Sequence, residues 1–178
     1  MSSFFTAAVV WATFKWEEVA DEPGADRWLI LMFFLVGLSI GVHLLNLLAI
    51  PAIGFVYYFR KYKNTTTKGV IYAGLISMAV LGFVQSVLIP GLAYFPALME
   101  RAFKNSMGTP FNFGLIFFFI LLIALMIIGL YITYKKGSAL FNTIINSFMV
   151  LCIGYSCFFM IIIRSGANTP IDENNPEN

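Results

Sequence analysis

The chain has 178 residues, of which 60% are hydrophobic and 11% are charged, and its mean hydropathy is +0.84. A soluble domain of this size cannot bury so much apolar surface, so the composition excludes a soluble globular protein and indicates an integral membrane protein. The net charge of +2 is too small to indicate a nucleic-acid partner.

The first apolar segment covers about residues 4–16 and is short for a membrane span, because a helical span needs about 20 residues. It has no positive n-region and no small-residue cleavage site, so it does not have the features of a signal peptide. We therefore expect it to be part of a longer membrane helix, with Met1 an internal methionine or a late start. A polar, largely acidic loop follows at residues 15–27.

Residues 28–59 carry no charge when His43 is neutral. One straight helix of that length would reach roughly 48 Å, against a hydrocarbon core of about 30 Å. Small or polar residues lie near its middle, and these are Gly37, Ser39, Gly41, His43 and Asn46, followed by Pro51. The stretch is therefore either one kinked, tilted helix or two short helices that meet near residues 41–46. The side of the membrane on which residues 17–27 lie depends on that choice.

Three further apolar spans are predicted at residues 69–89, 111–134 and 139–163. Pro90 and Gly91 are expected to end the first of them. Residues 92–107 can then place apolar side chains on one face, which is typical of an amphipathic helix lying on the membrane surface.

The predicted fold class is all-α, a polytopic transmembrane helical bundle over residues 1–166 with one interfacial helix and a polar tail at 167–178. Lysine and arginine are enriched in cytoplasmic loops of membrane proteins. This rule places the basic loops 60–68 and 135–138 in the cytoplasm. Residues 164–178 then fall on the outer face.

His43 and Asn46 are three residues apart, so they share one helical face or cap the two sides of a break. An imidazole and an amide near a break can bind a lipid phosphate or a substrate hydroxyl. The alternative is hydrogen bonding that only holds helices together, and both remain open. No second histidine, cysteine or carboxylate lies nearby, so no metal site is predicted.

Arg164 lies where the last span ends and is either an anchoring charge at headgroup level or a bidentate clamp for a phosphate. Other pairs favour helix packing, and these are Gly37 with Gly41, Gln85 with Ser86, and Asn142 with Asn146. No carboxylate lies within a span, and no nucleophile–base pair is visible. The residues of this chain alone therefore do not make a complete active site.

Three stretches carry a family resemblance, namely GLSIGVHLLNLLAIPA at 37–52, MSSFFTAAVVWATFKWEE at 1–18 with DEPGADRW at 21–28, and ANTPIDENNPEN at 167–178. They resemble a family of large bacterial membrane proteins defined by the domain of unknown function DUF2723. That family is related to transmembrane protein O-mannosyltransferases, which are GT-C glycosyltransferases and take a sugar from a polyprenyl-phosphate donor.

The resemblance implies a partial GT-C-like bundle in the bacterial inner membrane. It implies inverting transfer with a catalytic carboxylate upstream of this chain, so the chain resembles an internal fragment that is inactive alone. His43, Asn46 and Arg164 are then candidate contacts to the donor-lipid phosphate. The implied partners are membrane lipids, a lipid-linked sugar and a protein acceptor, with no nucleic acid and no cofactor beyond the donor substrate.

Two alternatives come from other functional classes. The interrupted stretch 28–59 suits a discontinuous helix that lines the site of a transporter, although no symmetry between two halves is visible. A structural bundle, in which the polar pairs only pack, is the other alternative.

Overall fold

The computed structural model describes residues 2–165, and residues 1 and 166–178 lie outside the described part. All regular elements between residues 2 and 165 are helical, which confirms the predicted all-α membrane bundle. Three helices in this part are long and apolar enough to cross a membrane, and these are Thr67–Met107, Phe113–Lys135 and Ala139–Phe159.

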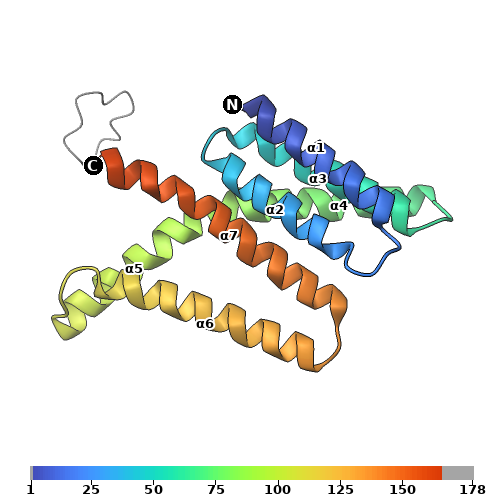
Figure 1. Cartoon of the computed structure of the whole chain (residues 1–178). Helices are drawn as coiled ribbons and strands as arrows, with labels where there is room; N and C mark the ends of the chain where they lie inside the picture. Colours follow the sequence, from blue (N-terminus) through green and yellow to red (C-terminus); the bar gives the residue numbers. More distant parts are fainter. Residues whose placement is uncertain (1, 166–178) are drawn as a thin grey trace. The chain divides into compact units, whose positions relative to one another are not determined.

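The described residues form two compact units, one from residues 2–65 with 146–165 and the other from Thr66–Ile145. The first unit contains the helices α1 (Ser2–Val19), α2 (Asp26–Ile40), η1 (Leu44–Leu48) and α3 (Ala49–Lys61), with the later part of α7 (Ala139–Ser165). Helices α1, α2 and α3 lie side by side (Figure 1).

The stretch 28–59 is two short helices and not one kinked rod. Helix α2 ends at Ile40, and His43 takes up an extended backbone with φ −163° and ψ 122° that no α-helix allows. The short 3₁₀-helix η1 then turns the chain into α3. Pro51 falls in the first turn of α3, where a backbone N–H would have no partner within the helix, so proline is tolerated there.

Helix α3 folds back along α1. Near the start of α1 the Thr6 hydroxyl contacts Asn46 of η1, while near its end the Trp16 ring stacks on Tyr57 of α3. The 15 residues of α2 and 13 of α3 reach about 22 and 20 Å, both short of a hydrocarbon core of about 30 Å. The stretch therefore returns to the end at which it started. Residues 17–27 accordingly lie at the same end of the unit as residues 60–65.

Helices α2 and α7 meet backbone to backbone through glycines. A Cβ on Gly37 would overlap the carbonyl oxygen of Leu151, and a Cβ on Gly154 would lie 2.7 Å from the carbonyl oxygen of Phe34. A Cβ on Gly41 would meet Phe158 at an ordinary 3.7 Å. Close packing thus involves Gly37 as predicted, but its partner is Gly154 on another helix.

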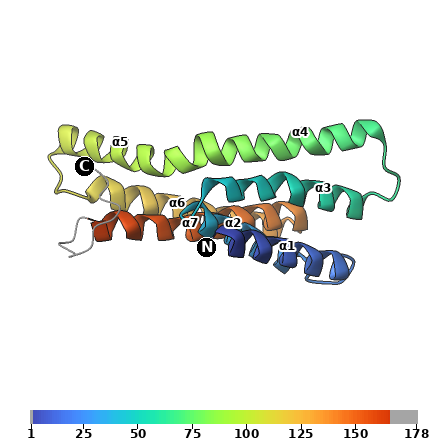
Figure 2. The same cartoon turned by 90° about the horizontal axis from the view of Figure 1, so that it is seen from above.

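In the second unit, α4 (Thr67–Phe83), the π-helical turn η2 (Val84–Leu88) and α5 (Ile89–Met107) form one continuous helix (Figure 2). Pro90 and Gly91 therefore do not end the helix, contrary to the expectation from sequence, and residues 92–107 continue it. The reason is the π turn, in which the N–H of Ile89 bonds to the carbonyl of Val84 five residues back. This wider turn makes room for the ring of Pro90, which would clash in a regular α-helix.

The end of α5 is tied to the start of α6 (Phe113–Lys135) by Glu100. One carboxylate oxygen accepts the N–H of Asn112 at 2.8 Å, and the other accepts those of Gly114 at 2.8 Å and Leu115 at 3.2 Å. The first N–H groups of a helix lack partners within it and favour negative charge, so this carboxylate stabilises the beginning of α6. The ring of Phe103 packs edge-on against Phe113 beside it.

We expect Gly154→Ala to destabilise the protein by about 1–3 kcal/mol, because the added methyl group forces α2 and α7 apart. Gly41→Ala is the matched control, since its methyl group makes only an ordinary contact. The measurement is the free energy of unfolding in mixed detergent micelles, followed by circular dichroism. Equal effects of the two substitutions would contradict a glycine-dependent crossing.

Candidate functional site

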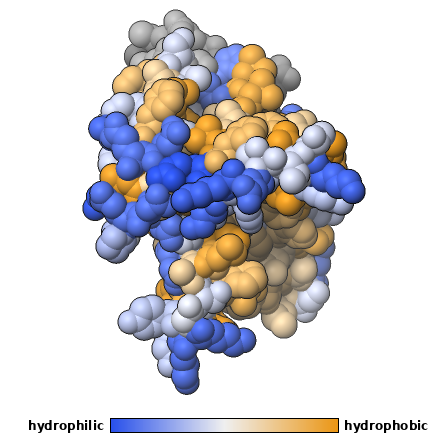
Figure 3. Space-filling model, turned by 90° about the vertical axis from the view of Figure 1, so that its right-hand side faces the viewer, coloured by the Kyte–Doolittle hydropathy of each residue, from blue (hydrophilic) through white to orange (hydrophobic). Residues whose placement is uncertain are grey.

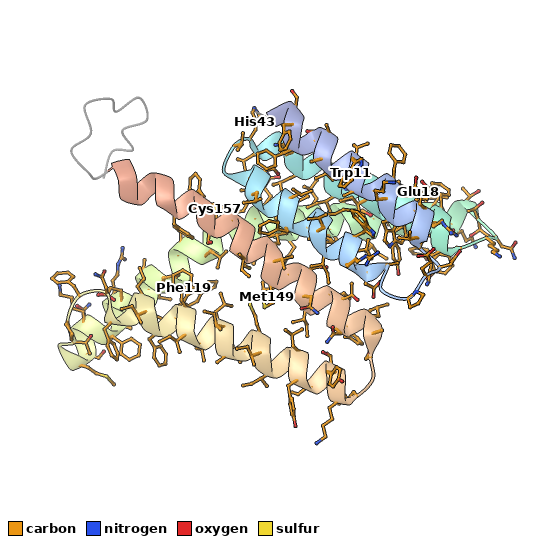
Figure 4. The ribbon with its side chains drawn as sticks, viewed as in Figure 1. Trp11, Glu18, His43, Phe119, Met149 and Cys157 are labelled. Carbon is orange, nitrogen blue, oxygen red and sulfur yellow. The ribbon has the colours of Figure 1, made fainter. Side chains whose placement is uncertain are left out.

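The turn between α2 and α3 carries His43 on its surface. The Nδ1 atom of His43 accepts the N–H of Leu45 at 3.2 Å, which caps the first turn of η1. A neutral imidazole that accepts at Nδ1 carries its proton on Nε2. The side chain is exposed at the end of the unit, so Nε2–H is available as a donor to a ligand (Figure 4).

Asn46 has a different environment from His43, and of the two predicted arrangements the structure has the break, with His43 capping η1. Asn46 is 7% exposed, and its side-chain oxygen accepts the hydroxyl of Thr6 at 3.0 Å. This bond ties the turn to α1. Asn46 is thus placed to hold the turn, while the side chain of His43 is exposed. The predicted phosphate contacts of both remain predictions.

Arg164 lies in the last turn of α7, and its side chain falls outside the described residues. Phe158 of α7 lies beside Gly41 at the end of α2, where a Cβ on Gly41 would be 3.7 Å from that of Phe158. Arg164 follows Phe158 by less than two helical turns, about 9 Å along the axis. The backbone therefore brings Arg164 and His43 to the same end of the first unit.

The opposite end of this unit carries a polar cluster that the sequence analysis did not anticipate. The Arg60 guanidinium donates through Nη2 to Asp21 at 2.6 Å and through Nε to the carbonyl oxygen of Glu17 at 3.2 Å. The Trp16 and Tyr57 rings stack at 5.4 Å beside it. Figure 3 shows hydrophilic side chains gathered at this end. The loop 15–27 is largely acidic and the last turn of α3 is basic. These opposite charges are the feature of the sequence that could have predicted the cluster.

Neither end offers the ligands that a metal ion needs. Among the described side chains, those of residues 3–159, no three His, Cys, Asp or Glu residues come together as metal ligands would. The chemistry available is hydrogen bonding by an imidazole at one end and by an arginine–carboxylate pair at the other.

A double-mutant cycle tests the bond that holds the turn. We expect Thr6→Val and Asn46→Ala each to destabilise the protein, with a coupling energy of about 0.5–1.5 kcal/mol between them. The measurement is again the free energy of unfolding in micelles. Thr65→Val, at an exposed threonine, is the control and should change it by less than about 0.5 kcal/mol. Additive effects of the two substitutions would show that the bond does not contribute.

Comparison with protein-family models matches residues 1–66 to the family described as protein O-mannosyl-transferase TMEM260 N-terminal domain. No curated protein and no solved structure matches the chain. The matched residues form α1, α2, η1 and α3, and the match ends just before α4 begins. Over residues 1–66 the chain is therefore similar to the protein O-mannosyl-transferases of that family, as the resemblance of its first two stretches predicted.

Proposed function

We propose that this chain serves in a membrane glycosyltransferase of GT-C type, similar to protein O-mannosyl-transferases, that takes its sugar from a polyprenyl-phosphate donor. The match of residues 1–66 carries this proposal. The three long apolar helices support it, because a donor with a polyprenyl tail is met within a bilayer.

The donor phosphate would lie at the end of the first unit that carries His43. Three leucines of the turn are more than half exposed, and these are Leu44 at 52%, Leu45 at 65% and Leu48 at 60%. They give the polyprenyl chain an apolar surface beside an imidazole donor. Exposed imidazoles are costly among lipid chains and are often functional there, which favours a ligand for His43 over packing alone.

Each candidate residue then has a distinct part in the transfer. The leaving group is a lipid phosphate, and donors aimed at its oxygens stabilise the charge that develops as the sugar leaves. His43 would supply one N–H, and Arg164 a bidentate pair. Asn46 would act as a positioning residue through its bond to Thr6. A carboxylate general base would activate the acceptor hydroxyl.

The orientation follows from the basic loops. With residues 60–68 and 135–138 in the cytoplasm, as the distribution of lysine and arginine favours, the tail 164–178 lies outside. Because the stretch 28–59 folds back, residues 17–27 share the cytoplasmic side with residues 60–65. The end that carries His43 then points toward the outer face, in the inner membrane of a bacterium.

Donor binding tests the site. We expect His43→Ala and Arg164→Ala each to weaken binding of radiolabelled polyprenyl-phosphate mannose by about tenfold or more, because a hydrogen bond to a charged group contributes about 1.5–3 kcal/mol. Arg101→Ala, at an exposed arginine of α5, is the control. Binding that is unchanged in both variants would favour a structural bundle. Uptake of a soluble sugar into vesicles would favour a transporter.

Cysteine labelling tests the orientation. We expect cysteines introduced at Asp21 and at Lys63 to react with a membrane-impermeant maleimide only when the cytoplasmic face is open. Cys152 and Cys157 are replaced by serine beforehand, since both are free thiols. A cysteine at Lys136 is the reference for the second basic loop. Labelling of Asp21 and Lys63 from opposite sides would contradict the hairpin.

A further inference from the structure

The polar end of the first unit contains a groove that the proposed sugar transfer does not use. It lies between the ends of α1 and α3, has a volume of about 350 Å³ and is lined by Glu17, Val56, Phe59, Arg60 and Lys63. Two of the lining residues are apolar and three are charged. The groove therefore offers a ligand both an apolar wall and a charged rim.

Along the groove, apolar side chains are followed by charged ones, which is the order found at a membrane interface. Val56 and Phe59 lie on the apolar part of α3 and form one wall of the groove. The charged residues come at the helix ends. An apolar wall next to charged helix ends is the arrangement expected where acyl chains give way to headgroups.

The charges of the groove include both signs. Arg60 is engaged by Asp21 at 2.6 Å and by the carbonyl oxygen of Glu17 at 3.2 Å. Lys63 and the carboxylate of Glu17 form no ion pair with any side chain of residues 3–159, the side chains that the structure describes. The groove thus presents one ammonium and one carboxylate that are open to a ligand. A ligand that satisfies both carries an anionic and a cationic group in the same headgroup.

We propose that this groove binds the headgroup of an aminophospholipid such as phosphatidylethanolamine. The lipid phosphate would pair with the Lys63 ammonium beside Arg60. The lipid ammonium would donate a hydrogen bond to the Glu17 carboxylate. An acyl chain would lie against Val56 and Phe59. Basic pockets between membrane helices on the cytoplasmic side bind the phosphates of lipid headgroups, and here Glu17 adds a partner for an ammonium.

Other headgroups fit this groove less well. An anionic headgroup such as phosphatidylglycerol leaves the Glu17 carboxylate unpaired and close to a second negative charge. A choline headgroup has no N–H to donate, so it lacks the charge-assisted hydrogen bond that an ammonium gives. The combination of Glu17 with Lys63 therefore selects a primary amine together with a phosphate.

Native mass spectrometry of the full chain in detergent micelles tests the proposal, with short-chain phosphatidylethanolamine, phosphatidylcholine and phosphatidylglycerol as probes. We expect phosphatidylethanolamine to bind at least fivefold more tightly than the other two, about 1 kcal/mol. Glu17→Gln should remove that preference, and Lys63→Gln should weaken all three lipids. Phosphoethanolamine without acyl chains should fail to compete, which distinguishes a lipid ligand from a soluble phosphate.

Two neighbouring substitutions are matched controls. Glu18→Gln removes a carboxylate that is paired with Lys15, and Lys61→Gln removes an ammonium next to Arg60, yet neither residue lines the groove. Both should leave the preference unchanged. Equal affinity for the three lipids, tighter binding of phosphatidylglycerol, or the same loss in the control variants would overturn the proposal. All four residues are exposed, so the variants should keep the unfolding midpoint of the parent chain.

Discussion

The first unit depends on hydrogen bonds that replace the helical ladder where α2 stops. Backbone N–H groups at membrane depth must find partners within the protein. The N–H groups of Val42 and His43 both bond to the carbonyl of Ser39, and that of Leu45 bonds to the imidazole of His43. The N–H of Asn46 then bonds to the carbonyl of His43. These four N–H groups therefore keep partners where the helix stops, so the apolar stretch can reverse its direction there.

The reversed stretch 28–59 needs neighbouring helices to pack against, and glycines allow one of these neighbours to approach closely. Lipid chains are as apolar as leucine, so helices in a membrane associate through close packing and not through a hydrophobic driving force. Gly37 and Gly154 let α2 and α7 touch along their backbones. Helix α1 packs on another side of α2, where Ala12 of α1 and Met32 of α2 are fully buried. The short helices α2 and α3 are therefore held by neighbours that are themselves longer.

Composition and hydropathy were sufficient to predict an all-α membrane bundle, because apolar length is a property of sequence alone. The break near His43 was also predictable, but not whether the chain folds back, since that depends on contacts between residues far apart such as Trp16 and Tyr57. Pro90 was misleading because a π turn, which leaves no clear sequence signal, accommodates its ring. The capping role of Glu100 likewise depends on a partner in the next helix.

The boundary of the family match bears on how the candidate site is assembled. The match ends at residue 66, and the first unit contains residues up to Thr65 together with the later part of α7. His43 therefore belongs to the matched segment, whereas Arg164 comes from a helix outside it. The glycine contact between α2 and α7 is what brings the two to one end of the unit. A donor site built from both residues would thus depend on a packing contact that lies well away from the phosphate itself.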